Sequence, residues 1–306
     1  MALPSSGPLS INDIAVEFGG SVPHSLSEYY GVATGIPASG TIAIDDFYGT
    51  SSASPISATG GTISDSGGYR YHTFTSNGTF TINSPAAGAF SNTVETLIVA
   101  AGGGIDLYSP SLSTSRQHGG GGAGGMVETS FSASVGSKSV SIGQPVNFGT
   151  GLNSSVTSLT TAIGGGRGGR QNQAGLSGGS GGGSGNGNSG ASGTAGQGNS
   201  GGGSSVGGYG GGGGGAGQAG QAAVFGYPSN GGRGGNGKTW LNGVTYAGGG
   251  GGGGFSQSYN SGAGGTGGGG YLGNGTFYGG GAGAGANSPI PVLQGYQGIV
   301  IFRYQI

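Results

Sequence analysis

The sequence contains no cysteine, so disulfide bonds, thiolate catalysis and cysteine-bound metal sites are excluded. Only 6% of the residues are charged and the net charge is −1, which argues against a nucleic-acid partner and against charge-driven disorder. No apolar run approaches the roughly 18 residues that a membrane-spanning helix requires. The first residues lack the basic and apolar stretches of a signal peptide, so we expect a soluble protein made in a cytoplasm, without membrane insertion.

Carboxylates are missing from the second half of the chain. All nine acidic residues lie at or before Glu128, where only Arg70 and Arg116 oppose them, a net charge of −7. The six formal charges beyond that point are all cationic: Lys138, Arg167, Arg170, Arg233, Lys238 and Arg303. This division either marks a partner of opposite charge at one end or reflects a scaffold with few charges. Glycosidase chemistry needs two placed carboxylates and is therefore excluded from residues 129–306.

Other catalytic patterns are also missing. The histidines His24, His72 and His118 are scattered and show no metal-ligand spacing. The adjacent carboxylates Asp45 and Asp46 stand next to an expected helix start, where capping explains them. Lys238 follows glycine as in a phosphate-binding loop, but the next residues predict a turn rather than a helix. We expect a protein that is not an enzyme and that has no cofactor and no metal.

Glycine is what the sequence has instead, with 86 of 306 residues. Ordering so many glycines costs on the order of 100 kcal/mol of backbone entropy and buries no side chain. The glycine-rich part is therefore either a tether or a structure built from backbone. Residues 176–205 have the composition of a tether. Gly-Gly-X triplets at 165–170 and 231–236, and eleven aromatic residues between 209 and 296, favour order.

An extended left-handed helix with three residues per turn places every third side chain on one edge and leaves bare backbone on the others. Collagen has this helix too, but it requires abundant proline, and the chain has only 11 prolines. We therefore expect packed helices of the polyglycine II type with connecting loops.

The first 50 residues predict a small helical and loop module with an internal repeat, because residues 6–14 and 39–47 share one pattern. Ile14–Phe18 is the first expected helical turn, closed by two glycines. Ser25 and Glu28 have capping-box spacing and predict a second turn. The module is too small for a large core, so its apolar residues are expected to pack on another protein or another copy.

Period-two alternation then predicts strands at residues 69–75, 78–82, 94–100, 126–131, 138–142 and 298–304. Because the last strand follows the glycine-rich part, we expect it to return to the early sheet. The fold class is mainly β: a module at 1–50, an antiparallel β-sandwich at 51–142 plus 298–306, and a glycine-rich distal insertion at 143–297.

Four stretches, 73–82, 94–104, 119–127 and 298–304, resemble the glycine-rich domain of bacteriophage tail-fibre and other virion proteins. The opening residues 3–11 and 40–49 are similar to a short N-terminal module of phage structural proteins, those of cyanophages among them. The glycine-rich part is similar in kind to phage tail-tip adhesins, whose polyglycine helices form a sandwich with variable binding loops at one end. The resemblance implies a virion protein of the tail or fibre, made in the host cytoplasm, that contacts the host surface.

The resemblance further implies that residues 1–50 bind other virion proteins and that the chain forms a homo-oligomer, with a trimer favoured. The partner at the other end is a host surface glycan or an outer-membrane component. A purely structural virion component, such as a capsid decoration, neck or baseplate protein, is the alternative.

Aromatic rings among glycine and asparagine between Phe225 and Tyr278 resemble the composition of an antibody paratope. Arg233 and Lys238 would pair with phosphate or carboxylate groups on a glycan. The candidate receptor-binding residues are Phe225, Tyr227, Arg233, Lys238, Trp240, Tyr246, Phe255 and Tyr259. The alternative is that these rings cover the polyglycine layers and supply the hydrophobic core of the region.

Overall fold

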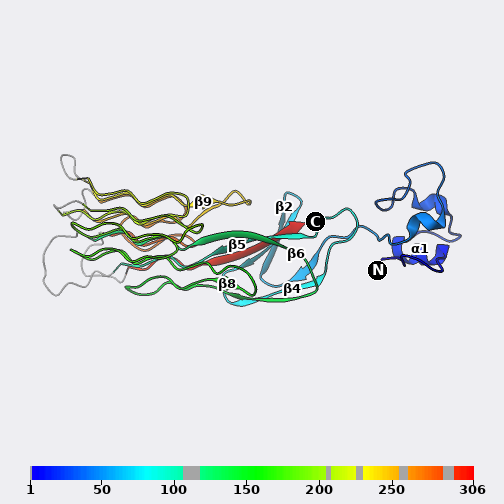
Figure 1. The fold of residues 1–306 in the computed structure, drawn as a ribbon, viewed down its shortest axis with the longest axis horizontal. Helices are drawn as coiled ribbons and strands as arrows, with labels where there is room; N and C mark the ends of the chain where they lie inside the picture. Colours follow the sequence, from blue (N-terminus) through cyan, green and yellow to red (C-terminus); the bar gives the residue numbers. More distant parts are fainter. Residues whose placement is uncertain (1, 106–117, 205–207, 225–229, 255–260, 285–292) are drawn as a thin grey trace.

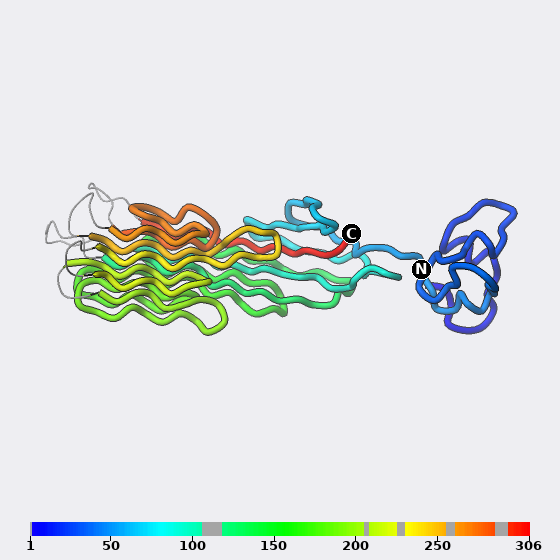
Figure 2. Tube along the Cα trace, turned by 90° about the horizontal axis from the view of Figure 1, so that it is seen from above, coloured from blue at the N-terminus to red at the C-terminus, as the bar shows by residue number. Residues whose placement is uncertain are grey.

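The computed structural model describes residues 2–105, 118–204, 208–224, 230–254, 261–284 and 293–306. Three parts follow one another along the long axis of the molecule (Figure 1). The N-terminal module lies at one end, a β-sandwich lies in the middle, and the glycine-rich region forms the other end. The sandwich and the glycine-rich region are continuous, since several chain segments run through both (Figure 2).

The N-terminal module contains one α-helix and two short 3₁₀ helices, α1 (Ile11–Phe18), η1 (Leu26–Tyr29) and η2 (Ile44–Phe47). In each, an acidic side chain at the third position accepts a hydrogen bond from the backbone N–H of the capping residue. The capping box predicted at Ser25 and Glu28 is confirmed. The first helix was predicted to begin at Ile14, which is wrong: Ser10 caps it with Asp13, so it begins at Ile11.

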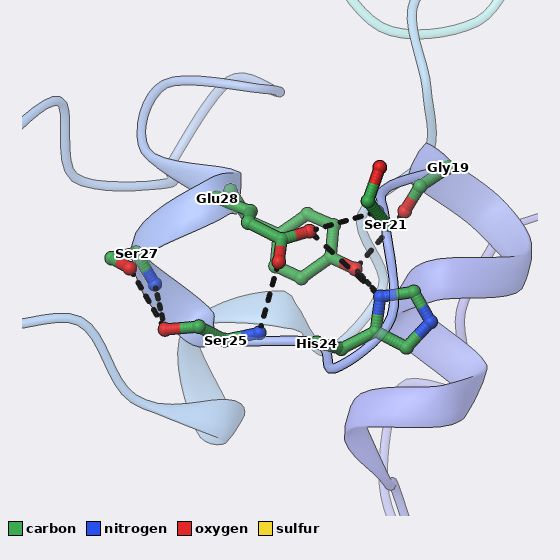
Figure 3. A network of polar contacts seen from close by, with 7 residues as sticks. Gly19, Ser21, His24, Ser25, Ser27 and Glu28 are labelled. Carbon is green, nitrogen blue, oxygen red and sulfur yellow. Dashed lines mark hydrogen bonds and ion pairs between the residues drawn. The ribbon is translucent and has the colours of Figure 1, made fainter.

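The core of the module is small. Ile14, Tyr29 and Phe47 are fully buried, and the rings of Tyr29 and Phe47 meet edge to face at 6.0 Å. A polar network joins η1 to the end of α1 (Figure 3). The Tyr29 hydroxyl donates to the Gly19 carbonyl at 3.0 Å and lies 3.2 Å from His24 Nδ1. Glu28 accepts the backbone N–H groups of Ser21 and Ser25, so hydrogen bonds supply the order that a larger core would give.

Two antiparallel sheets form the sandwich. The first has the order β1-β4-β7-β8 and the second the order β2-β3-β11-β5-β6. The strands are β1 (Ser57–Thr59), β2 (Thr62–Ser66), β3 (Tyr69–Phe74), β4 (Gly78–Ser84), β5 (Thr93–Val99), β6 (Met126–Ser132), β7 (Gly136–Ser141), β8 (Ser155–Val156) and β11 (Ile299–Gln305). As predicted, the last strand returns to the early sheet, where it pairs with β3 and β5.

The sandwich core is aromatic on the inner face of β11. Phe302 is fully buried, stacks on Phe80 with ring centroids 4.1 Å apart and meets Phe74 edge to face. Alternation along β11 places Val300, Phe302 and Tyr304 in this core, while Ile299 and Ile301 face the opposite side. The five-stranded sheet is therefore apolar on both faces.

A histidine lies inside the sandwich core. His72 is fully buried, with Nδ1 2.7 Å from the Gly60 carbonyl oxygen and Nε2 3.0 Å from the Tyr304 hydroxyl. Because a carbonyl oxygen only accepts, Nδ1 carries the proton and Nε2 accepts from Tyr304. Burial lowers the pKa of His72 below its ordinary value of 6.5, and the hydrogen bond to Gly60 opposes that effect.

The buried histidine predicts loss of stability in mild acid. The folded state holds His72 neutral, whereas the unfolded chain takes up a proton near pH 6.5. The free energy of unfolding is then fully retained above that pH and falls below it, by at most about 1.4 kcal/mol per pH unit. Thermal melts of wild type and His72→Gln between about pH 7.5 and pH 5 test this. A wild-type pH dependence no steeper than that of the variant would contradict the prediction.

The segment 118–126 runs through the centre of the glycine-rich region. Its backbone N–H groups donate with a period of three, each set to one neighbouring segment, over 2.8 to 2.9 Å. The three sets are Gly119, Gly122 and Gly125 to segment 163–169; Gly120 and Ala123 to segment 211–214; and Gly121 and Gly124 to segment 279–282. This period is that of a three-residue helix. The region is a lattice of polyglycine II-type helices, as predicted.

The neighbours of the central segment complete the lattice. Three further segments, 100–103, 180–183 and 250–253, donate hydrogen bonds to its carbonyl groups. The six neighbours also bond to one another in a ring, in the order 100–105, 163–169, 180–184, 210–214, 248–253 and 279–284. Backbone hydrogen bonds in three directions thus replace the side-chain core that glycine lacks. Each contributes roughly 0.5–1.5 kcal/mol net, so order depends on the whole set.

Two details of the predicted organisation differ from the structure. The stretch 176–205, which has the composition of a tether, lies in the lattice over its described residues 176–204, with Ser180 and Ser184 fully buried. The boundary predicted at residue 143 does not separate the two parts, since segments 100–105 and 118–125 belong to the lattice, whereas β8, which follows residue 143, belongs to the sandwich. Strands β5, β6 and β11 each continue directly into a lattice segment, so no linker separates the two parts.

Candidate functional site

The lattice segments end at two faces. One lies on the sandwich side, and the other, which we call the far face, lies at the opposite end of the molecule. Described residues that border the undescribed stretches meet at the far end (Figure 2). Val224 and Asn230 pair through two backbone hydrogen bonds, Ile105 bonds Leu293, and Gly253 donates to the carbonyl of His118. The lattice therefore fixes these residues at the end opposite the N-terminal module.

Four of the eight predicted contact residues, Phe225, Tyr227, Phe255 and Tyr259, lie outside the described residues. Their bordering residues do belong to the far end. Asn230 pairs with Val224, and the backbone N–H of Gly254 donates to the Ser261 hydroxyl at 3.2 Å. In the sequence, residues 225–229 and 255–260 therefore each lie between ordered segments that end at the far face.

The two predicted cations occupy different places. Arg233 is exposed on segment 230–237, which bonds to the lattice segments 210–214 and 248–253. Lys238 begins β9 (Lys238–Thr239) at the sandwich end and forms an ion pair with Glu128 of β6, with 3.1 Å between Nζ and Oε1. Arg233 therefore fits a role in contact with a ligand better than Lys238 does.

Trp240 and Tyr246 are core residues. The hairpin of β9 and β10 (Thr245–Tyr246) lies beside the sandwich and not at the far end (Figure 1). It packs against the outer face of the five-stranded sheet, where Trp240 is 4% exposed and Tyr246 is 3% exposed. The rings contact a cluster that includes Leu97 and Ile301. The burial of these two rings does not fit an exposed contact role. It fits the alternative, that the rings pack in the core.

An arginine holds the hairpin on the sheet. Arg303 of β11 donates to Glu95 Oε2 at 2.6 Å and to the Leu241 carbonyl at 3.1 Å. Its guanidinium also lies over the rings of Tyr69, at 4.2 Å, and Trp240, at 5.8 Å. Burial lowers the pKa of Arg303, but Glu95 and Tyr71 together outweigh this effect, so the pKa is raised above its ordinary value. The signal of this contact in the sequence is a single cation, Arg303, within an apolar final strand.

Among the described residues of the sandwich, carboxylates and cations meet at Asp65 with Arg70, Glu95 with Arg303 and Glu128 with Lys238. The described lattice segments beyond Glu128 carry Arg167, Arg170 and Arg233 and no carboxylate. Charge is therefore distributed along the long axis, acidic in the N-terminal module and basic in the lattice.

Comparison with known proteins gives one match. Residues 74–305 match the family model described as a glycine-rich domain, which covers the sandwich and the lattice together. Neither the curated proteins nor the solved structures contain a match to the chain. Within the described ranges, every helix is too short or too polar to cross a membrane.

Proposed function

The chain belongs to the glycine-rich domain family, and we propose that it is a bacteriophage structural protein of the tail fibre or tail tip that binds the host surface without catalysis. The observation that carries this proposal is the arrangement along the long axis (Figure 1). A small module stands at one end, and ordered lattice segments converge on a far face at the other. This arrangement suits a protein that attaches to the particle through the small module and presents the far face to a partner.

The lattice suits such a role physically. Hydrogen bonds in three directions hold the described segments, so their ends at the far face are fixed and lose little entropy on binding. The partner is a host surface glycan or an outer-membrane component, bound weakly by each copy and more strongly by several copies together. The N-terminal module binds other virion proteins, and several chains assemble, as a trimer in the proposed fibre.

A purely structural virion component, such as a neck, baseplate or decoration protein, is the second candidate. The burial of Trp240 and Tyr246 favours it, because it removes two rings from the set that a receptor site would use. Under this alternative the far face contacts other virion proteins instead of the host.

Binding to host cells separates the two candidates. Purified full-length protein is titrated onto cells of candidate bacterial hosts, beside a variant with Phe225, Tyr227, Phe255 and Tyr259 replaced by serine. We expect saturable binding by the wild type, and at least about a tenfold loss in the variant at unchanged melting temperature. Leu176→Ser, which changes an exposed residue beside segment 180–184, is the control. Absence of wild-type binding across hosts would favour the purely structural role.

A further inference from the structure

Three neighbouring segments of the lattice region, 144–152, 271–278 and 293–297, each carry a partly exposed aromatic ring, and all their residues are described and uncharged. We refer to these three segments together as the side face. The Gln294 side chain donates to the side-chain carbonyl of Asn147, and the Gln294 backbone N–H donates to Asn274 Oδ1 at 2.9 Å. These bonds tie the three segments together, so the side face is a fixed surface.

The rings on the side face are held in place but remain accessible. Phe148 and Tyr296 are each 37% exposed, and Tyr271 is 47% exposed. Tyr296 meets Tyr278 edge to face, with ring centroids 5.5 Å apart, and its backbone N–H donates to Gly280 at 2.7 Å. An ordered ring that keeps a solvent-facing part loses little entropy when a ligand covers it.

Phe148 occupies its position at a cost to folding. Its φ is 56°, in the left-handed region that costs an L-residue roughly 1–2 kcal/mol. Its ring nevertheless remains 37% exposed. Glycine would adopt the same backbone without strain. A strained residue with a partly exposed ring is a candidate for contact with a ligand.

The chemistry around these rings identifies the ligand class. Asn147, Asn274 and Gln294 supply amide groups, which both donate and accept hydrogen bonds, and the three segments themselves carry no cation to pair with an anionic group. Apolar ring faces beside amides match a pyranose ring, which has an apolar C–H face and a rim of hydroxyl groups. We propose that the side face binds a neutral glycan. This site goes beyond the proposed contact at the far face and does not use its residues.

A glycan array tests the side face. Full-length protein is applied to immobilised neutral hexose and N-acetylhexosamine oligosaccharides, with sialylated and sulfated oligosaccharides for comparison. We expect binding to neutral glycans, lowered at least about tenfold in Phe148→Gly and in Tyr296→Ser. Phe148→Gly should keep or raise the melting temperature, because glycine removes the strain. That readout separates ligand contact from a structural role, and Leu176→Ser should bind like the wild type.

Three results would overturn the inference. The first is no neutral glycan bound anywhere on the array, and the second is equal binding by Phe148→Gly and Tyr296→Ser. The third is a self-associated wild type that these substitutions dissociate in sedimentation experiments, which would make the side face a contact between copies. The far-face serine variant should still bind the array. Host-cell binding and array binding therefore fail independently.

Discussion

Replacing Gly121 with alanine should unfold or severely loosen the lattice. A Cβ atom at this position would lie 2.2 Å from the Gly103 carbonyl oxygen and 3.1 Å from the Ala282 backbone nitrogen. Both are backbone atoms of neighbouring helices, so no side chain can rotate away. We expect a loss of about 3 kcal/mol or more in the free energy of unfolding, measured by chemical denaturation.

Gly273→Ala is the matched control for this substitution. Nothing lies within 4 Å of a Cβ built there, and its φ is outside the left-handed region. Alanine should therefore be neutral or stabilise by up to roughly 1 kcal/mol, through reduced entropy of the unfolded chain. Equal stability of the two variants would mean that the central helices are not packed against one another.

Trp240→Ala should destabilise the protein by roughly 3–5 kcal/mol, as expected for truncation of a buried aromatic ring. The ring is 4% exposed and packs over the outer face of the five-stranded sheet, beside the Arg303 guanidinium. Thermal and denaturant unfolding measure the loss. Any loss of cell binding in this variant should follow the loss of folded protein.

Leu241→Ala provides the control one residue further along the hairpin. Its side chain is 53% exposed, although its carbonyl accepts from Arg303, so alanine keeps the backbone contact. We expect a change within about 0.5 kcal/mol. A Trp240→Ala protein that is stable but no longer binds cells would contradict the assignment of Trp240 to the core. It would support a contact role for this ring.

The sandwich could be predicted because its signal is local. Alternation in residues 94–100 and 298–304 reports one buried face, and the strands end within a residue or two of the predicted positions. Strands β1 and β8 were not predicted, because three and two residues are too short to show alternation. Strand β2 was not predicted either, because all five of its residues are exposed and none marks a buried face. The helix begins three residues before its predicted start, because Ser10 and Asp13 form a capping box in front of Ile11.

The type of helix in the lattice could be predicted from the sequence, but the arrangement of the helices could not. Gly-Gly-X triplets indicate a three-residue helix, yet bare backbone does not encode which segments become neighbours. That explains why residues 100–105 and 118–125 were assigned to the sandwich, although Gly121 lies at the lattice centre.

The candidate site was harder to predict, because an aromatic residue among glycines has the same sequence signal at a surface and in a core. Trp240 is buried between its own hairpin and the sheet, whereas Phe148 is partly exposed at a strained turn. Only the fold distinguishes them. The side face also joins residues about 150 positions apart, Asn147 and Gln294, which no local pattern connects.

Native-state hydrogen exchange tests the central claim, that the glycine-rich region is an ordered lattice. The amides of Gly119, Gly120 and Gly121 donate to three different neighbouring helices and should be protected as strongly as those of β5 and β11. Exchange of these glycines at the rate of an unstructured chain, while the strands stay protected, would contradict the lattice and show that the region is a tether.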